Sequence, residues 1–139
     1  PAAQVVIVGG DGVSYGSKPK DGESWKAQML AELDGKLPLD RIHFLGRVPY
    51  PTYLSLLQVA RVHCYLTYPF VLSWSLTEAM AAGPLIVASD TEPVREVVRD
   101  GVNGRLVPFF DWLAEQGVPS TIVVPMVPWG PQVAICKAG

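Results

Sequence analysis

Glu78 is the one charged side chain in the stretch from Tyr68 to Ser89, whose other residues are apolar, small or hydroxylated. Two chemistries fit a carboxylate at this place. Ser75 and Glu78 have the spacing of a capping box, in which the serine caps a helix and the glutamate accepts a hydrogen bond from the serine amide. The same carboxylate, one turn inside a helix, could instead accept both hydroxyls of a ribose, beside a diphosphate at the helix N-terminus. The pattern alone leaves both interpretations open.

The glycine-rich stretch GGDGVSYGS is the second candidate for ligand chemistry, because it directly follows an expected strand. After Gly10 and Gly12 the next glycine is Gly16, so the spacing is not that of a dinucleotide-binding G-x-G-x-x-G loop. The expected second strand closes on Gly46 rather than on an acidic residue, and the sequence lacks the Gly-Lys-Ser/Thr of a P-loop. A dehydrogenase and a P-loop enzyme are therefore disfavoured, and the loop is either a tight turn or a ligand contact.

Metal and nucleophile chemistry find little support in the sequence. His43 and His63 lie inside apolar strands without a second ligand at a useful spacing, so we expect core histidines and no metal site. Ser73 and Ser75 follow an expected strand but lack the flanking glycines of a nucleophile elbow. We therefore assign no catalytic residue within this chain.

The composition limits the classes of protein to which this chain can belong. With 139 residues and 49% hydrophobic side chains, the chain can bury one core. A net charge of -2 suggests no basic face for a nucleic acid, and no apolar run reaches the roughly 18 residues of a membrane span. Cys64 and Cys136 make no disulfide framework and the start resembles no signal peptide, so we expect the cytoplasm. Because the chain begins without Met, we expect a piece of a longer protein.

Strands and helices are expected to alternate along the chain. Continuous β-branched runs predict buried strands, and apolar residues three and four positions apart predict helices. The expected strands are Gln4 to Gly10, Asp40 to Gly46, Arg61 to Thr67, Pro84 to Ser89 and Gly104 to Phe109. The expected helices are Glu23 to Leu33, Tyr50 to Ala60, Ser75 to Ala82 and Glu92 to Asp100. This order is typical of a Rossmann-like α/β fold with a doubly wound parallel sheet, which binds ligands beyond the carboxyl ends of its strands.

Residues 112–139 do not continue this pattern. The segment WLAEQG could form one short helix, but four prolines follow between positions 118 and 139. These prolines argue against a helix or a central strand. We therefore divide the chain into an α/β domain, 1–111, and an irregular or divergent tail, 112–139, which is packed on the domain or disordered.

Five segments together resemble a known family: VVIVGGDG, DRIHFLGRV, YLSLLQVARVHCYLTYP, SLTEAMAAGPLIVASD and PVREVVRDGVNGRLVPFFD. In order and spacing they are similar to the carboxyl-terminal domain of retaining family 4, or group 1, glycosyltransferases. The resemblance covers Val5 to Asp111. It implies one lobe of a GT-B fold, with the first strand of that lobe and the whole amino-terminal lobe missing from this chain. It also implies an enzyme that moves a hexosyl-type sugar, with retention, from a nucleoside diphosphate sugar to an acceptor hydroxyl.

The resemblance also implies donor contacts at the positions that match the family's motifs. Glu78 matches the second glutamate of the Glu-x7-Glu motif, which holds the donor ribose. The other implied contacts are the diphosphate with Ser73, Trp74 and Ser75, the nucleobase with Arg47 and Val48, and the glycine loop with Gly10 and Gly12. The donor is of the UDP or GDP type, the acceptor is not identified, and neither a cofactor nor a metal is implied.

The chain also departs from the family pattern. Phe70 stands where the family has the first motif glutamate, and Ser73 replaces the usual glycine of the following turn. The upstream Arg and Lys that meet the donor phosphates, and the lobe that carries a catalytic His, have no counterpart here. We therefore expect the isolated chain to be inactive. The alternative is a GT-B-like binding or assembly module that has lost catalysis.

Overall fold

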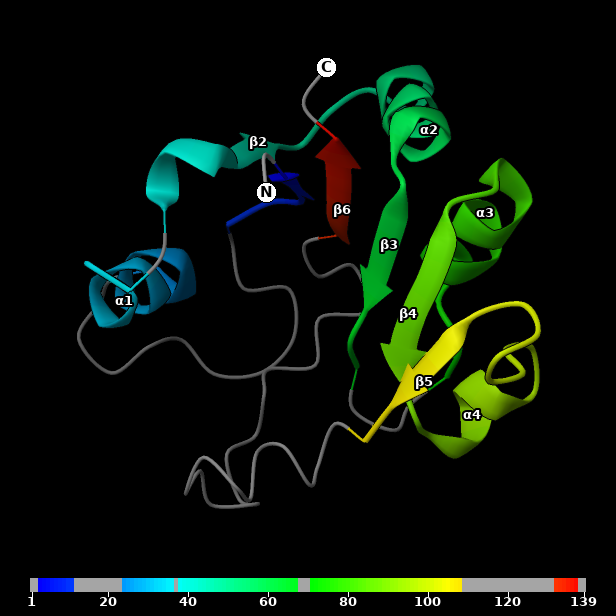
Figure 1. The fold of residues 1–139 in the computed structure, drawn as a ribbon. Coiled ribbons are helices and arrows are strands. Elements are labelled where there is room, and N and C mark those ends of the chain that lie inside the picture. The colour runs from blue at the N-terminus through cyan, green and yellow to red at the C-terminus, as the bar shows by residue number, and fades with distance from the viewer. Residues whose placement is uncertain (1–2, 12–23, 37, 68–70, 109–131, 138–139) are drawn as a thin grey trace.

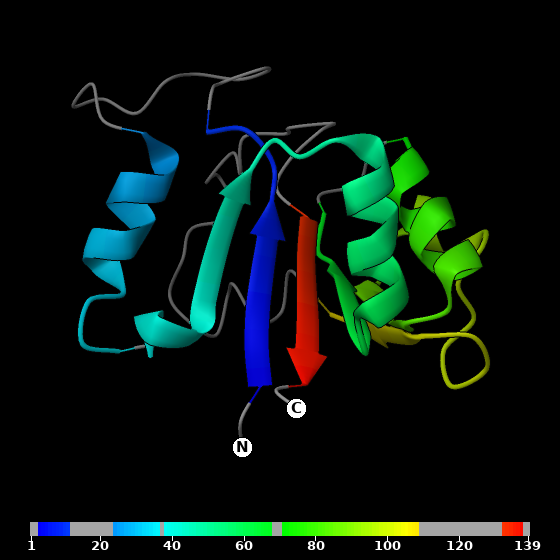
Figure 2. The ribbon, with the colours of Figure 1, turned by 90° about the horizontal axis from the view of Figure 1, so that it is seen from above.

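Figures 1 and 2 show the fold in a computed structural model of the chain. The structure describes residues 3–11, 24–36, 38–67, 71–108 and 132–137, the last range by its backbone alone. Its elements in chain order are β1 (Ala3–Val8), α1 (Trp25–Glu32), the 3-10 turn η1 (Leu39–Arg41), β2 (Ile42–Gly46), α2 (Tyr50–Val59), β3 (Val62–Tyr65), α3 (Trp74–Ala82), β4 (Leu85–Ser89), α4 (Glu92–Arg95), β5 (Arg105–Val107) and β6 (Gln132–Lys137). The predicted alternation of strands and helices, and with it the Rossmann-like α/β class, is confirmed.

The strands form one sheet in the order β2-β1-β6-β3-β4-β5. β1 pairs in parallel with β2, β3 with β4, and β4 with β5. β6 lies between β1 and β3 and runs antiparallel to both, as Figure 2 shows. The five predicted strands therefore share one direction, and their carboxyl ends lie at one edge of the sheet.

β6 corrects the prediction for the tail. We expected no central strand within 112–139, yet residues 132–137 form one. The prolines that argued against a strand all precede β6, the last of them at position 131, so none of them removes an amide from the ladder. The predicted short helix WLAEQG lies outside the described residues.

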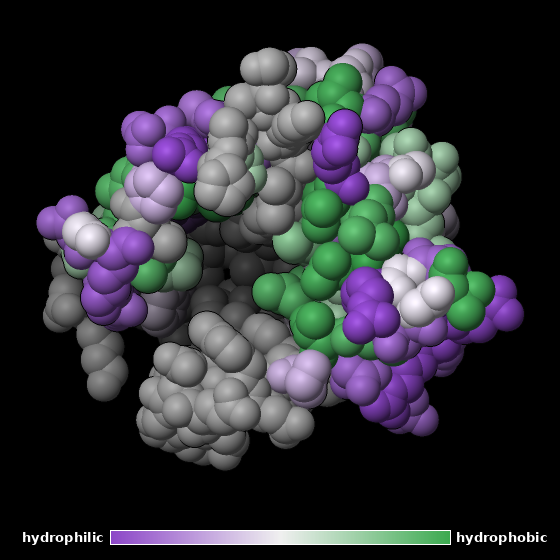
Figure 3. Space-filling model, in the orientation of Figure 1, coloured by the Kyte–Doolittle hydropathy of each residue, from purple (hydrophilic) through white to green (hydrophobic). Residues whose placement is uncertain are grey.

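The hydrophobic core is concentrated at one end of the sheet. Its buried side chains come from α2, α3, β3, β4 and the segment around α4: Leu57, Tyr65, Leu76, Ala79, Ile86, Ala88, Val94 and Val98. α1 buries none of its residues and lies apart from α2, α3 and α4 in Figure 1. Apolar residues gather over β3 and β4 in the view of Figure 3, whereas hydrophilic residues gather around α4. The core therefore supports α2 and α3 much more firmly than α1.

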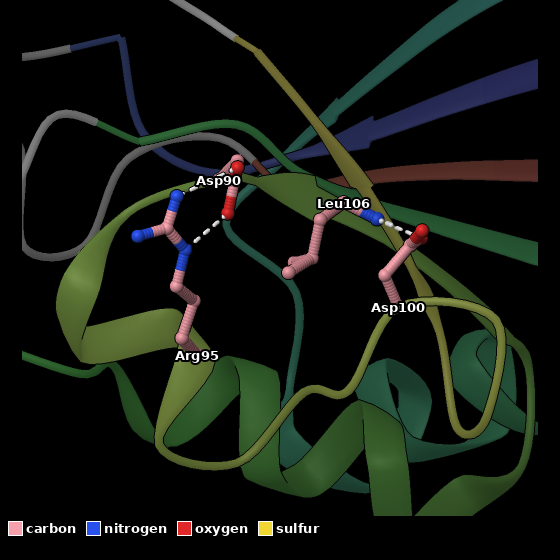
Figure 4. Close-up of polar contacts among 4 residues, drawn as sticks. All are labelled: Asp90, Arg95, Asp100 and Leu106. Atoms are coloured by element: carbon pink, nitrogen blue, oxygen red, sulfur yellow. Dashed lines mark hydrogen bonds and ion pairs between the residues drawn. The ribbon is translucent and has the colours of Figure 1, made fainter.

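Two aspartates fix the segment around α4 (Figure 4). Asp90, after β4, accepts two hydrogen bonds from Arg95, at 2.5 Å from Nε and 2.8 Å from the terminal nitrogen. The hydrogen bond from Arg95 lowers the pKa of Asp90 below its usual value. Asp100 accepts a hydrogen bond of 2.9 Å from the amide of Leu106, where β5 runs beside β4. These contacts hold both ends of the β4–β5 connection against the sheet.

α4 ends earlier than the sequence predicts. We expected a helix from Glu92 to Asp100, but α4 ends at Arg95. The side chain of Asn103 accepts a hydrogen bond of 2.6 Å from the amide of Arg99 and donates one of 2.9 Å to the carbonyl of Val97. The following residues are therefore held as a turn, because an asparagine side chain competes with the helix for backbone hydrogen bonds.

Candidate functional site

The loops after β1 and β2 meet at the carboxyl edge of the sheet. Val8 pairs with Gly46 in the last register position of the two strands, and the Gly9 amide donates a hydrogen bond of 2.9 Å to the Gly46 carbonyl. Gly46 has a φ of 65°, a left-handed conformation that glycine adopts without steric cost. This turn directs the chain away from β2 and toward α2, so that residue 47 lies beside the glycine loop.

Arg47 lies directly against Gly10. A Cβ built on Gly10 would lie 2.8 Å from Nε of Arg47, so a side chain at position 10 would displace the guanidinium group. The structure thus brings together two features that the sequence singled out separately, the glycine loop and the Arg47–Val48 pair. Val48 is half-buried on the same turn. Gly12 lies outside the described residues.

The start of α3 is built differently from the predicted capping box. Ser73, not Ser75, is the N-cap residue, and its hydroxyl accepts a hydrogen bond of 3.3 Å from the Ser75 amide. Glu78 lies in the second turn of the helix and does not reach back to Ser75. The prediction of a Ser75–Glu78 capping box is therefore wrong, because the upstream hydroxyl of Ser73 takes the amide that Glu78 would have needed.

The connection between β3 and α3 is anchored at both ends by buried side chains. Near its start, the Thr67 amide donates a hydrogen bond of 2.7 Å to the hydroxyl of Ser89, which is fully buried. At its end, the Ser73 amide donates one of 3.1 Å to the hydroxyl of Tyr65. These two contacts fix where α3 begins relative to the sheet. Phe70, the position of the missing motif glutamate, lies outside the described residues.

Of the three amides predicted to meet a diphosphate, two already have acceptors within the protein. Ser73 donates to Tyr65, and Ser75 donates to Ser73. Trp74 is the first residue of α3, so its amide has no acceptor inside the helix. Its side chain is 75% exposed. The hydroxyls of Ser73 and Ser75 are hydrogen-bonded to each other at 2.9 Å.

Glu78 has a partner that the sequence did not indicate. The hydroxyl of Tyr50 donates a hydrogen bond of 2.8 Å to Oε1 of Glu78. Tyr50 is the first residue of α2, so this bond connects the carboxyl-edge ends of α2 and α3. The hydrogen bond to Glu78 is the main cause that raises the pKa of Tyr50 above its usual value. No local signal predicts this pair, because its members are 28 residues apart in the sequence.

A second tyrosine lies close to this pair. The ring centroids of Tyr50 and Tyr53 are 6.2 Å apart. Burial, with smaller contributions from Glu78 and Tyr50, raises the pKa of Tyr53 to about 12. Its buried hydroxyl has no hydrogen-bond partner among the residues that the structure describes. Tyr53 therefore shares the surroundings of Glu78 without bonding to it.

The structure confirms the predicted burial of one histidine and contradicts that of the other. His63 is fully buried on β3, as predicted, and burial lowers its pKa to about 4. His43 is exposed on β2 and is hydrogen-bonded to the Gln4 side chain at 2.7 Å, so the prediction of a core histidine is wrong there. The two residues differ because β2 alternates between its two faces and His43 lies on the exposed one. Within the described ranges, no three His, Cys, Asp or Glu side chains gather as a metal site would require.

The carboxyl edge thus offers a guanidinium group against a glycine loop, a carboxylate held by a tyrosine, and a capped helix N-terminus with an exposed indole. A cation and a helix N-terminus suit an anionic ligand, and a carboxylate suits hydroxyl groups. None of the helices in the described part of the chain is long and apolar enough to cross a membrane. The arrangement fits a polar, anionic ligand with hydroxyls.

The chain matches a family model and several curated proteins. The model described as glycosyl transferases group 1 matches residues 1–115. A phosphatidyl-myo-inositol mannosyltransferase of Mycolicibacterium smegmatis is 43% identical over 115 residues, which cover 80% of this chain and 25% of the relative. An uncharacterized glycosyltransferase of Methanocaldococcus jannaschii is 35% identical over 81 residues, 58% of this chain and 21% of that protein. The chain therefore spans about a quarter of the length of the curated relatives it matches.

Proposed function

Because the chain belongs to the group 1 glycosyl transferases, we propose that it is the carboxyl-terminal, donor-binding domain of a retaining family 4 enzyme with a GT-B fold. The complete enzyme would transfer a sugar from a nucleoside diphosphate sugar to an acceptor hydroxyl. The observation that carries this proposal is the place of Glu78, which lies on α3 at the carboxyl edge and faces the start of α2. Ligands of doubly wound sheets bind at that edge.

In this proposal Glu78 accepts the ribose hydroxyls of the donor. An ionised carboxylate is an acceptor with two oxygens, so it can receive both hydroxyls of a vicinal diol. The hydrogen bond from Tyr50 uses one lone pair of Oε1 and leaves the other oxygen, Oε2, for the sugar. Hydrogen bonds to a charged group contribute about 1.5–3 kcal/mol each, enough to matter in a donor site.

The diphosphate is proposed to lie at the start of α3. The positive end of the helix and the Trp74 amide favour an anion there, and the Ser73 and Ser75 hydroxyls lie on the same turn. Because the amides of Ser73 and Ser75 have acceptors in the protein, we assign the backbone contact to Trp74 rather than to all three amides. Helix amides and cationic side chains can carry the charge of the leaving diphosphate, so the proposal needs no metal.

The nucleobase is proposed to lie beside Arg47 and Val48. Arg47 packs against Gly10, which leaves a surface of guanidinium group and backbone after β1. A planar guanidinium group stacks on aromatic rings, and a nucleobase presents such a ring. The mycobacterial relatives are named as mannosyltransferases, which supports mannose as the first sugar to test. UDP and GDP are the first nucleotides to test, because the family resemblance implies a donor of one of these types.

Nucleotide binding tests the proposal. Calorimetry with UDP and with GDP should show that the chain binds one of them, and Glu78→Gln should weaken that binding by about 10-fold or more, as the loss of a charged acceptor predicts. The matched control is Glu96→Gln, which removes an exposed carboxylate just after α4 and should leave the affinity unchanged. If neither nucleotide binds at millimolar concentration, the donor-site proposal is wrong. We expect no sugar transfer by this chain alone, and measurable transfer would contradict that expectation.

A further inference from the structure

Tyr50 occupies an unusually constrained position for an exposed side chain. It is 57% exposed and lies between Pro49 and Pro51 at the first position of α2. The φ of Pro51 is fixed in the range that suits the first turn of a helix, and the Tyr53 amide closes this turn with a hydrogen bond of 3.0 Å to the Pro49 carbonyl. The backbone of Tyr50 is therefore ordered before any ligand arrives, and its hydroxyl is held at 2.8 Å from Oε1 of Glu78.

The carboxylate of Glu78 needs such a partner to keep one orientation toward a ligand. The terminal torsion of a glutamate has a broad, two-fold preference, so a carboxylate on a helix surface can rotate. A hydroxyl that donates to Oε1 fixes the plane of the group. One lone pair of Oε1 and both lone pairs of Oε2 then remain to accept hydrogen bonds from a ligand.

We propose that Tyr50 is a positioning residue for the donor ribose, which orients the Glu78 carboxylate so that it accepts a vicinal diol and discriminates against a sugar that lacks one hydroxyl. This inference rests on the proposed donor-binding function and deepens it, because it names a residue that controls selectivity for ribose. The recognised chemistry is the pair of adjacent hydroxyls of a ribonucleoside diphosphate. A site built to hydrogen-bond a hydroxyl rejects an analogue without it, because the analogue covers the half-buried acceptor and leaves it unpaired.

Tyr53 provides the matched control within the same helix. It lies one turn further along α2, its ring is tilted by 35° to that of Tyr50, and its hydroxyl makes no hydrogen bond to a described residue. Removal of the Tyr53 hydroxyl leaves the Tyr50–Glu78 bond in place. A change that appears in Tyr50→Phe but not in Tyr53→Phe therefore reports on the bond itself.

The test compares the full chain with UDP and 2′-deoxy-UDP, and with GDP and 2′-deoxy-GDP, by calorimetry. We expect the wild-type chain to bind the ribose form of one pair about 10-fold or more tightly than the deoxy form. Tyr50→Phe should reduce that ratio several-fold, mainly by weakening binding of the ribose form. Tyr53→Phe should keep the wild-type ratio. A role of Tyr50 in stability alone would change the unfolding midpoint and leave the ratio as it is.

A second measurement follows the bond without any nucleotide. Spectrophotometric titration in a Tyr53→Phe background, which removes the other tyrosine that Glu78 influences, should show a tyrosine pKa that falls when Glu78 is replaced by Gln, because the acceptor of the Tyr50 hydroxyl loses its charge. An unchanged titration would show that the bond does not form, and the proposal would be overturned.

The outcomes separate this inference from the proposed function. If Glu78→Gln abolishes discrimination while Tyr50→Phe retains it, the donor function stands and the role of Tyr50 is wrong. If the wild-type chain binds neither pair, or binds ribose and deoxy forms equally, the ribose role of Glu78 fails and the role of Tyr50 fails with it.

Discussion

His63 on β3 shows what a single buried polar side chain does to the molecule. It is fully buried, and neither ring nitrogen has a hydrogen-bond partner within the described residues. Burial disfavours the charged imidazolium and lowers the pKa of His63 from its usual 6.5 to about 4. The folded chain therefore keeps His63 neutral at a pH where the unfolded chain already protonates it.

The first prediction concerns acid stability. Between pH 6.5 and about pH 4 the unfolded state binds one more proton than the folded state at His63, so the free energy of unfolding falls as the pH falls through this window. At 1.36 kcal/mol per pKa unit the loss amounts to about 3 kcal/mol at pH 4. Urea unfolding of the wild type and of His63→Leu across this range should show a much steeper slope in the wild type.

Its control is Ile86→Val, which trims the same core without removing a titratable group. It should lower the free energy of unfolding by about 1 kcal/mol at every pH and keep the wild-type slope. The lowered pKa of Asp90 reduces the free energy of unfolding only below about pH 5, and it does so equally in the wild type and in His63→Leu. A slope in His63→Leu as steep as that of the wild type would contradict the prediction.

At the scale of single elements, two glycines are required for different reasons, one at the end of α3 and one at the start of β5. Gly83 follows α3 with a φ of 97°, and a Cβ there would meet no other atom within 4 Å. Gly104 lies buried before β5, where a Cβ would be 2.7 Å from Val98 and 3.1 Å from the carbonyl oxygen of Ile86. Gly83 is therefore required by the backbone conformation, and Gly104 by close packing.

The second prediction follows from this difference. Gly83→Ala should cost about 1–2 kcal/mol, the strain of a left-handed alanine at a helix end. Gly104→Ala should cost more, about 3 kcal/mol, because both β4 and the segment after α4 must shift. The urea concentrations at the midpoints of unfolding show which of the two variants is less stable. If Gly104→Ala proves as mild as Gly83→Ala, the packing around β5 is looser than the structure shows.

The start of α3 shows which local features the sequence predicts and which it does not. The helix, its glycine stop and the strand after it all follow from the sequence pattern. The capping box does not, because Ser73 and Ser75 are both good cap residues and local spacing does not decide between them. The contact of Ser73 with Tyr65 is what favours the upstream serine, and that contact depends on the tertiary fold.

On the scale of the whole molecule, stability is distributed unevenly. The buried cluster joins α2 and α3 to β3 and β4, whereas α1 buries none of its residues. One contact between α1 and the sheet places the ammonium group of Lys26 4.5 Å from the centre of the Phe44 ring on β2. Such a contact contributes about 0.5–1 kcal/mol at an exposed site, much less than a buried core does.

The third prediction is therefore a gradient in hydrogen exchange. Amides within α1 should exchange at least tenfold faster than those within α3, because regions with few buried contacts open locally at low cost. Exchange followed residue by residue by NMR measures both helices in one sample. Equal protection of α1 and α3 would show that the chain opens only as a whole.

The order of the elements could be predicted from the sequence, and the arrangement of the site only in part. The five predicted strands and the carboxyl edge follow from apolar runs and from the rules of α/β topology. β6 does not, because the prolines before it suggested an irregular tail and an antiparallel strand breaks the βα alternation. The Tyr50–Glu78 bond and the packing of Arg47 on Gly10 join residues that are distant in sequence, so only the folded chain shows them.

The anchors of the β3–α3 connection have a consequence for how this domain can diversify. Thr67 is fixed to Ser89 on β4, and Ser73 is fixed to Tyr65 on β3, so each end of the connection is held by a strand of the sheet. Lengthening a loop between fixed ends costs little, about 0.6 kcal/mol for each doubling of its length. An insertion after Thr67 should therefore leave α3 and Glu78 in place, provided that Leu72, which packs against the core just before Ser73, is kept. This connection is therefore a place where evolution, or protein engineering, can change the length and composition of the carboxyl edge while the start of α3 is kept.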